Sequence, residues 1–146
     1  MSAQTLNSTQ VYQQLKPIYL ALLVSLVANS ALVLFASPEV SVDPRTEDIS
    51  VLYSSLAFGA CLLGMVLNHV LLKPKRALKA HSPEGAVIRG FIISWVCFET
   101  AAIIGVILVF ISGSDEHYWS LLALSTLSML SHPPHEGRVK RALGVR

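Results

Sequence analysis

The residue with the clearest chemical potential is Glu99, which lies near the middle of an apolar run from Ala86 to Phe110. A run of that length can cross the hydrocarbon core of a membrane, where a charged carboxylate is costly unless it is compensated. Because removal from water disfavours the charged form, we expect Glu99 to hold a proton and to donate one hydrogen bond. It could carry a proton or bind a cation, or it could act only as polar glue between helices.

A partner for this acid is expected from the first apolar run of the chain. Ser25 and Asn29 lie one helical turn apart there and therefore share a face. Asn29 and Glu99 lie at about the same distance, in residues, from the start of the first and the third apolar run, respectively. We therefore predict an ion-binding site made of Glu99, Asn29 and Ser25.

Other residue types that carry chemistry are present, but their spacing does not predict an enzyme or a metal site. Cys61 and Cys97 lie within apolar runs, where thiols usually behave as small hydrophobic groups, so we expect both to be reduced. His132, His135 and Glu136 are too few for a typical zinc site. The sequence has no Cys-x-x-Cys pair, glycine-rich phosphate loop, zinc-protease signature or nucleophile elbow. We expect no catalytic residues, no metal and no cofactor.

The composition predicts an all-α integral membrane protein with four transmembrane helices in an antiparallel bundle. Of its 146 residues, 53% are hydrophobic and only 14% are charged, and the apolar residues form long blocks. The blocks lack a polar face, which argues against a soluble helical bundle. We expect a single domain with spans at about 18–37, 51–72, 86–112 and 115–131, followed by a basic tail at 132–146.

Charged residues separate onto two sides of this topology. One side carries Lys16, Lys73, Lys75, Arg76, Lys79, Arg89, Arg138, Lys140, Arg141 and Arg146. The other side carries Glu39, Asp43, Glu47, Asp48, Asp115 and Glu116, with Arg45 as its one basic residue. Because basic residues are retained in the cytoplasm, we expect the inner membrane of a bacterium, with both termini cytoplasmic.

The basic side is expected to contact membrane lipid. The residues predicted to lie at the headgroups are Lys73, Lys75, Arg76, Lys79 and Arg89. Nothing in the chain resembles a folded module that reads nucleic acid, so we expect no nucleic-acid partner.

Rows of small residues predict that the second and third spans pack closely. The rows consist of Ser54, Ala57, Cys61, Gly64 and Asn68 in the second span, and of Gly90, Ser94, Cys97, Ala101 and Gly105 in the third. An antiparallel register pairs Asn68 with Gly90, Gly64 with Ser94, Cys61 with Cys97, and Ala57 with Ala101. In this arrangement Glu99 points away from the second span.

A family resemblance rests on one group of residues in the third span and the loop before it. They are Ser82-Pro83-Glu84, Arg89, Phe98-Glu99-Thr100-Ala101, Ile104-Gly105 and Phe110. With these residues, the stretch from 54 to 110 resembles the helical hairpin of rotary ATPase c subunits. The resemblance implies that Glu99 is the ion-binding carboxylate of the returning helix. The whole chain is also similar to small uncharacterised bacterial four-span membrane proteins with a Glu in the third helix and a His-Pro ending.

Two functions remain open from the sequence. The first is a small subunit of a membrane assembly, either a homo-oligomer or a complex with other membrane subunits, that binds or conducts protons or cations through Glu99. The second is a structural or assembly subunit of a larger membrane complex, in which Glu99 is only interhelical polar glue.

Overall fold

The computed structural model describes residues 8–36, 46–112 and 116–145. All regular elements in these ranges are α-helices, which confirms the all-α prediction. The helices are α1 (Ser8–Ala36), α2 (Thr46–Leu71), α3 (Pro74–Ala77), α4 (Pro83–Ser112), α5 (Glu116–Ser131) and α6 (Glu136–Ala142).

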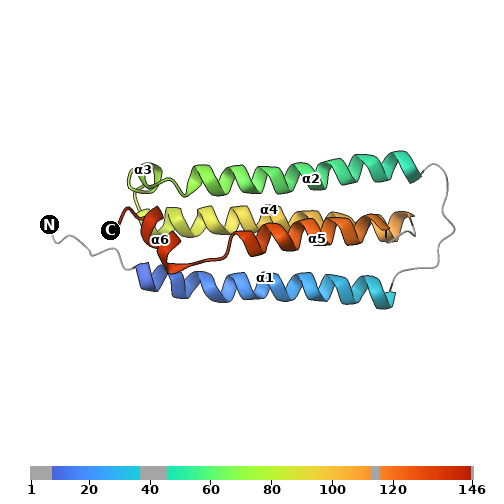
Figure 1. Ribbon diagram of the computed structural model, residues 1–146, viewed down its shortest axis with the longest axis horizontal. Coiled ribbons are helices and arrows are strands. Elements are labelled where there is room, and N and C mark those ends of the chain that lie inside the picture. Colours follow the sequence, from blue (N-terminus) through green and yellow to red (C-terminus); the bar gives the residue numbers. More distant parts are fainter. Residues whose placement is uncertain (1–7, 37–45, 113–115, 146) are drawn as a thin grey trace.

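The four long helices lie side by side, and each one runs in the opposite direction to the one before it (Figure 1). The start of α1, the short helix α3 and the helix α6 all lie at one end of the bundle. We call this end the α3 end. The expected acidic residues Glu39, Asp43 and Asp115, together with Arg45 and Arg146, lie outside the described residues.

Three described helices are long and apolar enough to cross a membrane: Ser8–Ala36, Ile49–Leu71 and Pro83–Ser112. The expected fourth span, α5, has 16 residues. At a rise of 1.5 Å per residue it is about 24 Å long, which is shorter than a hydrocarbon core of about 30 Å. The structure therefore supports three of the four expected spans by length and composition.

Two described segments outside the expected spans are helical, one before the first span and one after the last. Helix α1 begins at Ser8 rather than near Ile18, because Val11 and Leu15 are buried between exposed polar neighbours. The basic tail forms α6, which packs against α1 and α3 and buries Val139 and Leu143. A count of consecutive apolar residues cannot detect either segment, since buried positions alternate there with polar ones.

Helix α4 is the centre of the bundle. In its most apolar window 56% of the residues are buried, against 17% in α1 and 22% in α2. It packs against α1, α2 and α5, and its most extensive contact is with α2. Phe91, Trp95 and Phe98 are fully buried on its inner faces. The expected close pair of the second and third spans is therefore present.

The register of this pair differs by about one turn from the expected one. A Cβ atom on Gly64 would lie 2.6 Å from the Phe98 ring and 3.0 Å from Cys97 Cβ, so Gly64 does not face Ser94. A Cβ atom on Gly90 would meet Leu71 and Leu72 instead of Asn68. The Phe98 ring packs against α2 at Gly64, which has no side chain, and this contact helps to set the register.

Most of the small residues lie at helix contacts, although not all of them face the expected partner. Ala57, Cys61, Gly64, Asn68, Gly90, Ser94, Ala101 and Gly105 are buried, and Ser54 and Cys97 are half-buried. A Cβ atom on Gly105 would lie 3.0 Å from Tyr118, so Gly105 faces α5 rather than α2. Both cysteine thiols are free.

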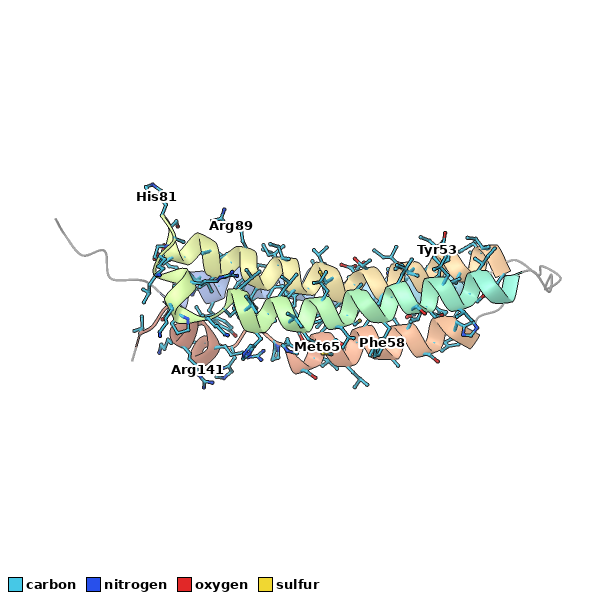
Figure 2. The ribbon with its side chains drawn as sticks, turned by 90° about the horizontal axis from the view of Figure 1, so that it is seen from above. Tyr53, Phe58, Met65, His81, Arg89 and Arg141 are labelled. Carbon is cyan, nitrogen blue, oxygen red and sulfur yellow. The ribbon has the colours of Figure 1, made fainter. Side chains whose placement is uncertain are left out.

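The outer surface is apolar along its length and basic at one end. Large apolar side chains are exposed on every long helix, for example Val27 at 70%, Val66 at 57% and Leu127 at 64%. Figure 2 shows that nitrogen-bearing side chains gather toward the α3 end, where His81, Arg89 and Arg141 are labelled. A soluble monomer rarely exposes so much contiguous apolar surface.

The Gly64 contact gives a direct test of the helix register. Gly64→Ala is expected to lower the free energy of unfolding by about 1–3 kcal/mol, because the fully buried Phe98 ring cannot move aside without strain. Gly59→Ala is the matched control on the same helix, since nothing lies within 4 Å of a Cβ atom there. It is expected to be neutral or to stabilise by up to about 1 kcal/mol through helix propensity. Thermal or denaturant unfolding in detergent measures both, and equal effects would contradict the observed register.

Candidate functional site

Glu99 is buried on the side of α4 that faces α1. It follows Trp95 by one helical turn and precedes Ala102 by one, and both neighbours are fully buried. The residue itself is 9% exposed. The bundle thus covers most of the Glu99 side chain, and the residue lies away from the centre of the contact with α2.

An aromatic cluster lies one turn below Glu99 and joins three helices. The Trp95 ring lies 5.2 Å from the Tyr19 ring of α1 and 5.3 Å from the Phe91 ring, centroid to centroid. Trp95 Nε1 donates a hydrogen bond of 3.0 Å to the carbonyl of His132, just after α5. The Tyr19 hydroxyl donates one of 3.1 Å to the carbonyl of Met129. These contacts fix the position of α4 relative to α1 and α5 at the depth of the acid.

The same contacts establish the register between α1 and α4, which run parallel. Tyr19 contacts Trp95, and further along the bundle Val33 and Val109 belong to one buried cluster. In both pairs the residue of α4 follows the residue of α1 by the same number of positions in the sequence. A single register therefore holds along the whole contact between the two helices.

This register separates Glu99 from its expected partner. Glu99 is level with Leu23, whereas Asn29 is level with Gly105, about 9 Å further along the helix axis. Across the described parts of the chain, no hydrogen bond or ion pair reaches the Glu99 carboxyl group. Asn29 keeps a buried side-chain Nδ2 without a partner, and Ser25 is half-buried on α1. The expected pair of Glu99 and Asn29 is not formed.

The residues predicted to lie at lipid headgroups share one location. Lys73, Lys75, Arg76, Lys79 and Arg89 are all exposed and all belong to the α3 end of the bundle. Arg89 Nε donates a hydrogen bond of 3.1 Å to the carbonyl of Gly85 within its own helix. These side chains leave their charges free to meet a surface or solvent.

The histidines near the end of α5 have local structural roles. His132 Nδ1 lies 2.9 Å from the carbonyl of Ser128, and its ring packs on Phe98 at 5.4 Å between centroids. The His135 side chain accepts a hydrogen bond from the backbone N–H of Gly137 and so caps α6. Within the described ranges, no three His, Cys, Asp or Glu side chains gather into a set that could hold a metal ion.

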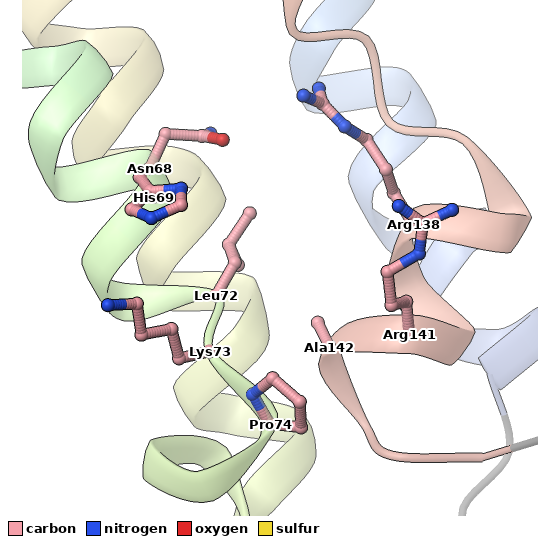
Figure 3. Close-up of a pocket in the computed structure, with 8 residues that line it drawn as sticks. All are labelled: Asn68, His69, Leu72, Lys73, Pro74, Arg138, Arg141 and Ala142. Carbon is pink, nitrogen blue, oxygen red and sulfur yellow. The ribbon is translucent and has the colours of Figure 1, made fainter.

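A second polar centre, which the sequence did not reveal, lies at the α3 end. It is a cavity of about 270 Å³ between the end of α2 and α6 (Figure 3). It is lined by Asn68, His69, Leu72, Lys73, Pro74, Arg138, Arg141 and Ala142. A signal was present in the tail, since Arg138 and Arg141 are spaced as one face of a helix and Val139 and Ala142 as another.

Comparisons of this chain with protein-family models, with curated proteins and with solved structures found no match.

The absence of an internal partner predicts how Glu99 contributes to stability. Glu99→Leu is expected to cause no loss of unfolding free energy, because it strands no described hydrogen-bonding group and removes a buried polar group. Tyr19→Phe is the comparison variant, since it removes the hydrogen bond to Met129 and should cost about 1 kcal/mol. Chemical unfolding of the purified protein measures both. A loss of stability in Glu99→Leu larger than in Tyr19→Phe would show that the acid holds the monomer together.

Proposed function

We propose that the protein is a four-span integral membrane protein in which Glu99 reversibly binds a proton within an oligomeric or multi-subunit assembly. The apolar outer surface and three helices of sufficient length support insertion into a membrane. Helix α5 packs along α4 and is the proposed fourth span. It reaches the full thickness with help from its flanking polar residues or from local thinning of the bilayer.

The distribution of charge supports an orientation. All described Lys and Arg side chains belong to the α3 end of the bundle, and this end is therefore the proposed cytoplasmic side. The proposed location is the inner membrane of a bacterium. Lipid headgroups on that side would contact the five exposed basic residues defined above.

One observation carries the proposal for Glu99: the residue is only 9% exposed, and no described residue makes a hydrogen bond or ion pair with its carboxyl group. A proton alone can neutralise such a group, whereas a bound metal cation needs several oxygen ligands. The other acids with described side chains, Glu84 and Glu136, belong to the α3 end, far from this depth. Reversible protonation is therefore the chemistry that the site supports best. The resemblance to the c-subunit hairpin agrees with this role for Glu99.

A second candidate function is a structural or assembly subunit. Because Glu99 has no described partner in its own chain, polar glue would have to act toward another subunit rather than within the monomer. The apolar stripe beside Glu99 includes Val96 and Ile103, which are exposed at 49% and 45%. A neighbouring helix packed on this stripe could supply the hydrogen-bond acceptor.

Flux measurements in proteoliposomes separate the two functions. We expect the wild type to take up protons when a potassium diffusion potential is applied. With Glu99→Gln, uptake is expected to fall to the leak of protein-free liposomes, because Gln keeps the shape and polarity of the side chain but cannot release a proton. Glu84→Gln is the matched control, since it removes an acid from the first turn of the same helix at the α3 end. Infrared spectroscopy should also show a protonated carboxyl band that Glu99→Gln abolishes.

Each outcome decides between the proposals. Equal proton uptake by the wild type and Glu99→Gln would contradict the transport role. Absence of uptake in both, combined with dissociation of the detergent-solubilised oligomer in Glu99→Leu, would support the assembly role instead.

A further inference from the structure

The cavity at the α3 end is built from ordered elements. One wall is the last turn of α2 with the three residues that follow it, Leu72, Lys73 and Pro74, and the other is α6. Helix α6 is held in place because Val139, Ala142 and Leu143 are buried, and the chain leaves it through Gly144, which has a φ of 70°. A side chain at Gly144 would be strained at that φ and would crowd Leu78. The position of this wall is thus fixed by the fold.

Two of the side chains that line the cavity each carry a buried hydrogen-bond donor without a partner among the described residues. Asn68 is 5% exposed, and its buried Nδ2 has no partner; Arg138 Nη1 is likewise buried and has none. Figure 3 shows Asn68 extending from α2 toward α6, with the guanidinium groups of Arg138 and Arg141 on the facing side. A buried donor without a partner costs about 1–3 kcal/mol, and a charged donor costs more. An acceptor that enters from outside would remove this cost.

The surrounding charge selects an anion. Arg138, Arg141 and Lys73 line the cavity, and none of its lining residues is acidic. The one acid of α6 is Glu136, whose Oε1 pairs with Lys140 Nζ at 3.0 Å. This hydrogen bond and the charge of Lys140 lower the pKa of Glu136. Glu136 pairs with Lys140 and is not among the residues that line the cavity.

We propose that this cavity binds a phosphate group through Asn68, Arg138 and Arg141. Guanidinium groups match the oxygens of a phosphate, and two of them with an amide donor can satisfy several of these oxygens at once. The phosphate could belong to an anionic lipid headgroup or could be free in solution. The lipid source rests on the proposed membrane orientation, which places the cavity at the cytoplasmic headgroups; a free phosphate does not depend on it.

Binding measurements on the full-length protein test this site. Native mass spectrometry would compare how many phosphatidylglycerol and phosphatidylcholine molecules the protein retains from mixed micelles. Thermal unfolding in lipid-free detergent would compare the unfolding temperature in sodium phosphate with that in sodium chloride at equal ionic strength. Arg138→Gln is expected to weaken binding of the effective probe about tenfold, the effect of losing one charged hydrogen bond. Arg76→Gln is the matched control, because it removes the same charge at the same end but lies outside the cavity.

A second variant covers the case in which Arg138→Gln fails to fold. Asn68→Asp keeps the size of the side chain and replaces a donor with a negative charge, so it should also abolish binding. Retention of phosphatidylglycerol alone identifies the lipid source, and stabilisation by inorganic phosphate identifies the free anion. The proposal is overturned if neither probe binds, or if Arg138→Gln and Arg76→Gln weaken binding equally, since that would show only diffuse attraction to a basic surface. Glu99→Gln should bind like the wild type, so failure here is distinct from failure of the proton-binding proposal.

Discussion

The close approach of α2 and α4 at Gly64 is the constraint on which the rest of the bundle depends. The Phe98 ring occupies the space that a side chain at Gly64 would need, and its other contact is the ring of His132 after α5. The carbonyl of His132 accepts the hydrogen bond of Trp95, which packs on Tyr19 of α1. A change in the distance between α2 and α4 would therefore displace the contacts of α5 and α1. Close contact at one glycine in this way positions the other three long helices, α1, α2 and α5, around α4.

Much of this fold could be predicted from the sequence, but the helix register could not. Long apolar blocks ended by Pro and Gly locate the long helices, because these features act locally, although α1 begins well before its apolar block. Register depends on which side chains interlock across a contact. The small residues of α2 and α4 recur every three or four positions, so a slip of one turn again places small residues opposite each other. Phe98 favours one of these registers, since its ring packs where Gly64 has no side chain.

The candidate site shows the same division between local and non-local information. The burial of Glu99 follows from the apolar run around it, and the structure agrees. Its pairing with Asn29 was predicted by counting from the start of each apolar run, which assumes that both runs begin at the same level. Helix α1 actually begins at Ser8, well before its apolar run. Buried residues recur there every three or four positions, and this part of the helix packs on α6. Counting from the start of each run therefore placed Asn29 more than one helical turn too close to the α3 end.

The two polar centres also differ in how their charge can be neutralised, and this difference explains why we assign them different ligands. A carboxyl group can bind a proton and become neutral, so Glu99 can stay buried without a partner from its own chain. A guanidinium group stays charged in proteins, so Arg138 cannot use that route and needs an anion from outside. Among the described residues no acidic side chain lines the cavity, and Glu136, the acid of α6, pairs with Lys140. The same physical requirement, that a charge removed from water must be compensated, thus underlies both proposals, a proton at Glu99 and a phosphate between α2 and α6.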